Sequence, residues 1–269
     1  MSATAGLAGE YASARRDTAP LTALRTRGLC KAFGGIQATN DVSLAIEPGA
    51  RHALIGPNGA GKTTLVNLLT GVLQPSAGTI ELEGQDITRL PAHQRVRRGL
   101  VRTFQINQLF ANLTPIETLT LVVAERDGLG ARPWRALGRR AIQVDEAASL
   151  AERFHLADSM NRRTRVLPYG KRRLLEIAIA VAARPRVLLL DEPVAGVPAG
   201  ESREILDTLA ALPGEVTVLL IEHDMDLVFR FANRMSVLVN GAVFAEGTPA
   251  EMARDARVKA AYLGEASLA

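Results

Sequence analysis

One segment of nine residues carries the residue types that bind nucleotide phosphates. It fits the phosphate-loop pattern Gly-x-x-x-x-Gly-Lys-[Ser/Thr] and consists of Gly56, Pro57, Asn58, Gly59, Ala60, Gly61, Lys62, Thr63 and Thr64. Its glycines let the backbone curl so that successive N–H groups face one point. Lys62 can then reach the outer phosphates, and the Thr63 hydroxyl can ligate Mg²⁺. The segment predicts a site for a nucleotide with Mg²⁺; the alternative is a glycine-rich turn that only caps a helix.

A second segment adds the carboxylates that hydrolysis requires. The apolar stretch Val187–Leu190 ends in Asp191 and Glu192. A phosphate-loop ATPase holds Mg²⁺ with a carboxylate at a strand end, which fits Asp191. An adjacent carboxylate can polarise the attacking water, which fits Glu192. Such a pair often only caps the next helix, but after a phosphate loop it indicates hydrolysis.

The elements that must position these residues alternate between strands and helices. Strand-like Arg51–Ile55 precedes the loop and helical Leu65–Leu69 follows it. Further strands are predicted at Leu24–Phe33, Val42–Ile46, Thr79–Leu82, Leu100–Phe104, Val187–Leu190, Val216–Ile221, Met235–Val239 and Val243–Ala245. Helices are predicted at Gly200–Leu212, Met225–Ala232 and from Pro249, and from Pro115 to about Ala183 with breaks near 128–133 and 167–170. Apolar strands that alternate with helices favour a parallel sheet buried on both faces.

Composition narrows the class of protein. The chain has 269 residues, of which 47% are hydrophobic and 22% charged, with a net charge of +4. No apolar run approaches the roughly 18 residues of a membrane span. Basic clusters lie at Arg95–Arg98, Arg139–Arg140, Arg162–Arg165 and Lys171–Arg173. Because they are spread out and lack interleaved aromatic residues, a solvated or docking surface is favoured over a nucleic-acid interface.

Four further motifs make the chain similar to ATP-binding cassette proteins, the nucleotide-binding subunits of ABC transporters, over about residues 24–265. Gln105 ends Arg102-Thr-Phe-Gln, and His223 follows a strand. The resemblance implies that Gln105 contacts Mg²⁺ and the attacking water, and that His223 contacts the γ-phosphate. It also implies that Phe33 stacks on adenine, where the alternative is a core aromatic.

The family signature, which is usually Leu-Ser-Gly-Gly-Gln, corresponds to Leu167–Lys171. In the family, this segment contacts the ATP of a second subunit across a dimer interface. Pro168 replaces the serine and so removes a hydroxyl and an N–H. Gly170 remains where a helix begins, so its backbone can still hold phosphate. Lys171 in place of the glutamine adds positive charge.

Where the chain departs from the common family pattern, it resembles the ATPase subunits of high-affinity branched-chain amino acid importers. Val194–Pro198, Gly247–Pro249 and the ending Ala261–Gly264 carry this likeness. It implies two transmembrane permease subunits, a second ATPase in a homo- or heterodimer, an external solute-binding protein, and a place on the cytoplasmic face of the bacterial inner membrane. Solutes of this subfamily also include amides and acids, and no nucleic acid is expected.

The predicted fold is an α/β phosphate-loop NTPase cassette with a mainly parallel sheet core, an antiparallel β subdomain and an inserted helical subdomain at about 106–184. The cassette is predicted at 23–265, after a disordered lead at 1–22. One alternative is a soluble cassette protein that acts on ribosomes or DNA, although such chains usually carry two cassettes or a long coiled coil. Another is a weakly hydrolysing regulatory partner, which Pro168 suggests and which the retained Glu192 and His223 argue against.

Overall fold

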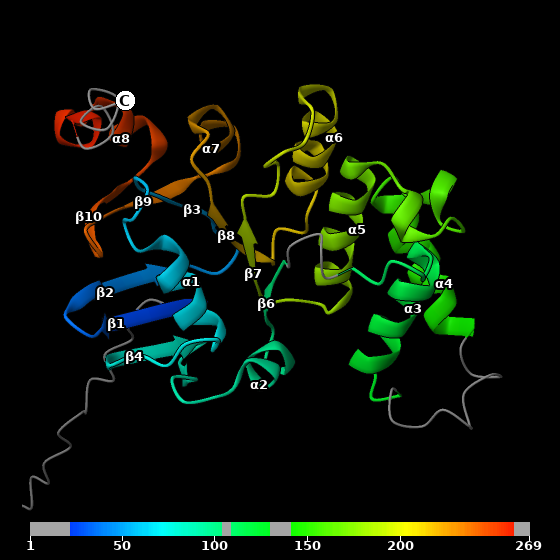
Figure 1. Ribbon diagram of the computed structural model, residues 1–269, viewed down its shortest axis with the longest axis horizontal. Coiled ribbons are helices and arrows are strands. Elements are labelled where there is room, and N and C mark those ends of the chain that lie inside the picture. The colour runs from blue at the N-terminus through cyan, green and yellow to red at the C-terminus, as the bar shows by residue number, and fades with distance from the viewer. Residues whose placement is uncertain (1–21, 104–108, 130–140, 261–269) are drawn as a thin grey trace, which may run out of the picture.

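The computed structural model describes residues 22–103, 109–129 and 141–260. Two β-sheets and a helical lobe make up this part of the chain (Figure 1). The predicted disordered lead up to residue 21, Gln105 and Ala261–Gly264 lie outside the described residues. Among the helices that the structure describes, none combines the length and the apolarity that a membrane crossing requires.

The central sheet has six strands in the order β10-β9-β3-β8-β7-β6. All neighbours are parallel except β9 and β10, which form an antiparallel hairpin. The strands span β3 Arg51–Ile55, β6 Leu100–Arg102, β7 Val187–Asp191, β8 Thr217–Ile221, β9 Arg234–Val239 and β10 Ala242–Gly247. The mainly parallel core predicted from the sequence is therefore confirmed.

The second sheet is antiparallel, in the order β2-β1-β4-β5. Its strands span β1 Leu24–Phe33, β2 Ile36–Ile46, β4 Ala77–Leu82 and β5 Gln85–Asp86. The prediction placed the second strand at Val42–Ile46, whereas β2 begins at Ile36. Its first half, Ile36–Asp41, is mostly solvent-exposed and lacks the run of buried apolar residues that marks a strand, but Phe33 pairs with Ile36 across a two-glycine turn. Cross-strand pairing thus extends this element beyond its apolar part.

Both faces of the central sheet are buried. Leu54, Leu189 and Leu219 pack against helix α1, Lys62–Thr70, and the antiparallel sheet. Leu188 and Leu220, which alternate with them along the strands, pack against the helical lobe and α6, Ala199–Ala210. Successive residues of a strand point to opposite faces, so strands with a helical layer on both sides read as continuous apolar runs.

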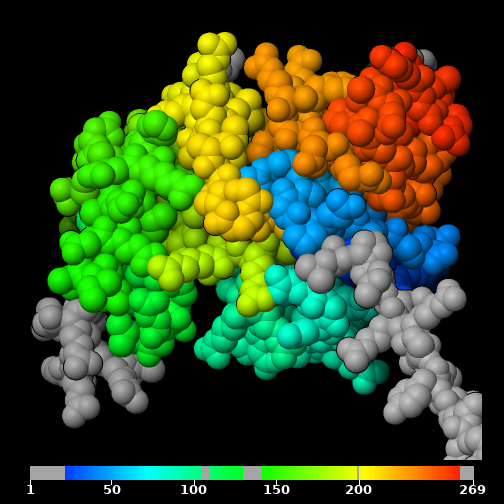
Figure 2. Space-filling model, turned by 180° about the vertical axis from the view of Figure 1, so that it is seen from behind, coloured from blue at the N-terminus to red at the C-terminus, as the bar shows by residue number. Residues whose placement is uncertain are grey.

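The helical lobe stands at one end of the molecule, and the C-terminal helix α8 at the other (Figures 1 and 2). The helical lobe comprises α3 Pro115–Arg126, α4 Ala141–Arg153, two 3₁₀ turns at Ala157–Ser159 and Thr164–Val166, and α5 Tyr169–Ala182. A capping box at Thr114 and Glu117 fixes the start of α3. The predicted break at 167–170 is confirmed, because α5 begins at Tyr169.

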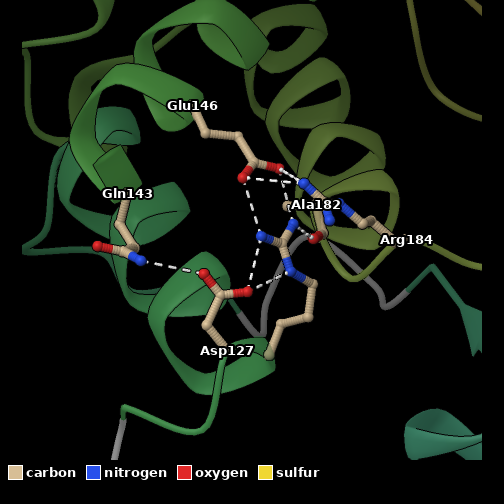
Figure 3. A network of polar contacts seen from close by, with 6 residues as sticks. Asp127, Gln143, Glu146, Ala182 and Arg184 are labelled. Atoms are coloured by element: carbon tan, nitrogen blue, oxygen red, sulfur yellow. Dashed lines mark hydrogen bonds and ion pairs between the residues drawn. The ribbon is translucent and has the colours of Figure 1, made fainter. Parts of the chain in front are cut away.

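A polar network joins the ends of three helices in this lobe (Figure 3). The Arg126 guanidinium donates to both Glu146 oxygens, at 2.7 and 2.8 Å, and to the Ala182 carbonyl at 3.0 Å. Asp127 accepts a bond of 3.0 Å from Gln143, and Arg184 donates to Glu146. The pKa of Arg126 is raised, first by its bond to Glu146. The network therefore fixes α3, α4 and α5 relative to one another.

Helix α2, Ala92–Arg97, is short and was absent from the sequence prediction. Arg95 has no exposed surface and donates to the carbonyl oxygens of Leu68, Leu69, Thr88 and Leu90. Burial lowers its pKa to about 10. The expectation that Arg95–Arg98 forms a solvated surface is thus wrong for Arg95, which caps the C-terminal end of α1. The remaining helices are α7 Met225–Phe231 and α8 Pro249–Arg254.

Candidate nucleotide-binding site

The glycine loop joins β3 to α1, as the phosphate-loop pattern requires. Gly56 and Gly61 are packed too tightly for any other residue: an added Cβ would lie 2.2 Å from the Leu238 carbonyl oxygen and 2.4 Å from that of Ala38, respectively. Gly61, with φ +99°, precedes α1, which has no side-chain cap and no acidic residue in its first turn. The first N–H groups of the helix and its positive dipole end are therefore suited to an anion.

Lys62 folds back over this loop. Its ammonium donates to the carbonyl oxygens of Gly56 and Pro57 at 2.5 and 2.8 Å. Asn58, Gly59 and Thr63 are exposed, whereas Ala60 is buried. The lysine thus places its charge at the loop that would cradle phosphates, and its side chain is held by groups of the loop itself.

Strand register brings the acidic motif to the same edge of the sheet. Ile221 at the end of β8 pairs with Leu54 of β3 on one side and with Asp191 of β7 on the other. The glycine loop, Asp191 and the segment after Ile221 therefore leave the sheet at one level. Ligands of parallel α/β sheets bind at this carboxyl edge.

Glu192 and His223 meet at this edge. The Glu192 carboxylate lies 3.4 Å from Nδ1 of His223, and the two side chains are 45% and 67% exposed. Glu192 has a φ of +47°, a strained conformation for a residue with a side chain. Its N–H donates to the Ile221 carbonyl at 2.9 Å. The structure thus brings together two predicted site residues that are 31 positions apart in sequence.

Arg173 of α5 stabilises this strained turn through hydrogen bonds to its backbone. Its guanidinium donates to the carbonyl oxygens of Glu192 and Pro193 at 2.5 and 2.9 Å, and to the buried Glu176 at 2.6 Å. Burial raises the pKa of Glu176 against the opposing effect of Arg173. The helix that begins with the signature segment therefore also holds the backbone of the residue expected to act on water.

The Glu222 carboxylate supports the backbone of the turn that carries His223. Its side chain is 1% exposed, and one carboxylate oxygen accepts from the backbone N–H groups of His223 and Asp224 at 3.0 and 3.4 Å. Burial raises the pKa of Glu222 despite these two bonds. The turn that carries His223 is thus fixed by a buried carboxylate.

The start of α5 is occupied by groups of the same chain. Gly170 N–H donates to the Glu201 carboxylate at 3.0 Å. The Lys171 ammonium donates to the His155 carbonyl at 2.5 Å and lies 3.4 Å from Glu204. The proline N-cap at 168 offers no side-chain bond. Glu201 therefore takes the N–H that the resemblance assigns to the phosphate of a second subunit.

Two predicted residues need separate mention. Phe33 lies at the end of β1 and is 47% exposed, so the alternative that it is a core aromatic is wrong. The Lys31 ammonium lies 5.3 Å from the centre of its ring. Gln105 falls outside the described residues, and its predicted contacts stay predictions.

Sequence reasoning missed four residues that support the site: Arg102, Arg173, Glu201 and Glu222. Arg102 lies in the motif that ends at Gln105, and Arg173 in the basic cluster after the signature, but nothing local indicated their partners. Arg102 bonds to Asp191, 89 positions away. Only a pairing of β6 with β7 could have suggested that contact.

Two family models match the chain. One is described as ABC transporter and matches residues 39–195. The other, described as branched-chain amino acid ATP-binding cassette transporter, matches residues 242–267. The resemblance read from the motifs is therefore confirmed, including the C-terminal segment.

Three curated relatives align over nearly their whole length. The high-affinity branched-chain amino acid transport ATP-binding protein BraF of Pseudomonas aeruginosa is 44% identical, over 90% of this chain and 98% of its own. LivG of Escherichia coli K12, with the same description, is 42% identical over the same shares of the two chains. The lipopolysaccharide export system ATP-binding protein LptB of Escherichia coli K12 is 35% identical, over 91% and 98%.

Solved structures agree with this assignment. The ADP conformation of an ATP-binding cassette of an ABC transporter superposes with a TM-score of 0.78 at 31% identity, over 91% of this chain and 99% of that one. A nucleotide-free cassette gives the same TM-score at 30% identity. Motifs, fold and relatives lead to one conclusion: the chain belongs to the ABC transporter family of ATP-binding proteins.

Proposed function

We propose that this chain is the ATP-hydrolysing subunit of an importer for branched-chain amino acids or related small amides and acids. The observation that carries the proposal is the meeting of the glycine loop, Asp191 and the Glu192–His223 pair at one sheet edge. The names of BraF and LivG support the solute class. LptB is named for lipopolysaccharide export, so family membership alone does not set the solute.

The residues at the loop fit a nucleoside triphosphate. The tight glycine positions keep side chains away from the curled backbone, and the start of α1 offers uncapped N–H groups and a lysine. Phe33, half-exposed at the end of β1, is the aromatic proposed to stack on adenine. Gly56–Thr64 would hold the phosphates.

The donor set also fits Mg²⁺ as an ATPase uses it. The described residues hold no cluster of three or more histidines, cysteines or carboxylates, and Mg²⁺ usually takes one or two protein oxygens besides phosphate and water. Thr63, Asp191 and Gln105 are the proposed protein contacts. Bound Mg²⁺ would neutralise charge that develops on the phosphates during transfer.

Hydrolysis follows from the side chains at the sheet edge. Glu192 is half-exposed, so its carboxylate can accept a proton from the water that attacks the γ-phosphate. His223, whose Nδ1 lies 3.4 Å from the Glu192 carboxylate, would contact that phosphate. The strained backbone of Glu192, held by Arg173, keeps the carboxylate at the turn.

The proposed assembly has two ATPase subunits, two transmembrane permeases and an extracytoplasmic solute-binding protein, at the cytoplasmic face of the inner membrane. Gly170 would contact the ATP of the second subunit. Because its N–H is bonded to Glu201 in the single chain, closing of the dimer on ATP must release that bond.

Two variants test the site in the reconstituted complex. Lys62→Ala should lose ATP binding, because the phosphates lose their cation. Glu192→Gln should keep ATP bound but lose turnover by a factor of roughly a hundred or more, the size expected for loss of a general base. Glu215→Gln, at an exposed position before β8, is the matched control and should keep the parental rate.

Hydrolysis at the parental rate by the Glu192→Gln complex would refute the assignment of the general base. The solute class is tested separately, by ATP-dependent uptake of labelled leucine, isoleucine and valine into vesicles that contain the complex. Uptake of none of these, with uptake of an amide or an aromatic acid instead, would correct the solute within the same proposed reaction.

A further inference from the structure

One arginine connects three elements of the site. Arg102, the last residue of β6, donates from Nη2 to Oδ2 of Asp191 at 2.6 Å and from Nη1 to Oδ1 of Asn67 at 2.9 Å. Asp191 ends β7, and Asn67 lies in α1, the helix of the phosphate loop. The side chains of Arg102 and Asp191 are 22% and 28% exposed.

The backbone directs Arg102 to this position. In the parallel ladder, Arg102 pairs with Leu189, two residues before Asp191. Leu100 lies on the same face of β6, because side chains alternate along a strand, and it packs in the core that contains α1. The guanidinium therefore extends between α1 and the end of β7.

The contact constrains the carboxylate of Asp191. A charge-assisted bond of 2.6 Å is short and strong. Exposed ion pairs contribute little to stability because water and salt screen their charges, but the partial burial of this pair weakens that screening. The guanidinium is planar, so its second bond, to Asn67, fixes the direction of the first. Arg102 bonds Oδ2 of Asp191, so this ion pair does not use Oδ1.

The charge of Asp191 also acts on a neighbouring buried carboxylate, that of Glu176. Burial, and to a smaller extent the charge of Asp191, raises the pKa of Glu176. Each of these two carboxylates has its own arginine, Arg173 for Glu176 and Arg102 for Asp191, both at 2.6 Å. The charge of Asp191 is thus balanced separately from that of its neighbour.

We propose that Arg102, held by Asn67, is the positioning residue that orients Asp191 for Mg²⁺ bound with ATP. This inference rests on the proposed function of Asp191 as a magnesium contact. Partners outside the metal's own contacts orient ligating carboxylates, and their loss typically weakens metal binding by about 10–100-fold. Arg102 precedes Gln105, the second proposed metal contact, by three residues in the sequence.

The test measures the contribution of metal to nucleotide binding without turnover. The dissociation constant of the full chain for the non-hydrolysable analogue AMP-PNP is measured in EDTA and in Mn²⁺. The constant in EDTA divided by the constant in Mn²⁺ gives a ratio, which is compared between the parent and each variant. Arg102→Met should reduce this ratio roughly tenfold while leaving binding in EDTA within about twofold. Arg102→Lys keeps the charge but not the fork geometry and should recover part of the loss.

Asn67 supplies an independent arm. Asn67→Ala should reduce the ratio by about threefold, and the double variant with Arg102→Met should be no worse than Arg102→Met alone, because both changes break one chain of contacts. Arg27→Met, which breaks an arginine–carboxylate pair between β1 and β4, is the matched control and should leave the ratio unchanged.

An unchanged or larger ratio in Arg102→Met would overturn the inference, as would fully additive effects in the double variant. If Arg102→Met does not fold, the ratios of Arg102→Lys and Asn67→Ala decide. Asp191→Asn separates the two levels of the argument. If it leaves the ratio intact, the metal contact assigned to Asp191 is wrong; if it lowers the ratio while Arg102→Met does not, only the role of Arg102 is wrong.

Discussion

Arg95 offers the sharpest test of how α2 supports the phosphate-loop helix. In Arg95→Met the side chain keeps most of its length but loses four hydrogen bonds to carbonyl oxygens, two of them at the end of α1. Bonds from a charged donor contribute about 1.5–3 kcal/mol each, or about 6–12 kcal/mol in total. The desolvation of a buried cation, several kcal/mol, offsets part of this. We expect a net loss of about 3–5 kcal/mol in the free energy of unfolding.

The assay is equilibrium urea unfolding near neutral pH. Arg95 is charged there, because its pKa of about 10 lies well above the pH of the buffer. The midpoint should fall at an unchanged slope. Arg97→Met is the matched control: it lies on the same helix, is 74% exposed, and makes an ion pair of 3.8 Å with Glu125. Its change should stay within about 0.5 kcal/mol. A loss below about 1 kcal/mol in Arg95→Met would refute the reasoning, because the carbonyl oxygens would then be satisfied without the arginine.

Three further predictions concern the supports of the site. Burial raises the pKa of Glu222 above its ordinary 4.5. The stabilising effect of this group is therefore present below pH 4.5 and lost as the pH rises through the folded-state pKa. In urea unfolding, the stability of Glu222→Gln relative to the parent should increase with pH, and a constant difference would contradict this. Arg126→Met should cost about 1–3 kcal/mol and speed hydrogen exchange at the ends of α3 and α4 but not in α1; equal acceleration in α1 would argue against a local role. In Gly170→Ala, the new Cβ would lie 2.1 Å from the Glu201 carboxylate, so Tm should fall by a few degrees and Glu201→Ala should recover most of the fall; no recovery would place the strain elsewhere.

The sequence by itself determined the elements and motifs whose information is local. The phosphate loop lies within nine consecutive residues, so its glycine, lysine and threonine positions needed no knowledge of distant partners. The same holds for the buried strands, because a strand covered on both faces is apolar throughout. The extension of β2 to Ile36 and the helix α2 were missed, since both depend on partners rather than on their own residues.

The tertiary structure alone decided how the site is held. Arg95 and Arg97 belong to one basic run, yet one is fully buried and the other exposed, because only Arg95 faces the carbonyl oxygens at the end of α1. Arg102 meets Asp191 only through the pairing of β6 with β7. Glu201 reaches Gly170 from the next helix in the chain. Each of these contacts joins residues that are distant in sequence, and a hydrogen bond acts over about 3 Å. Its formation therefore depends on the packing of whole elements as well as on the donor and acceptor groups of the two residues.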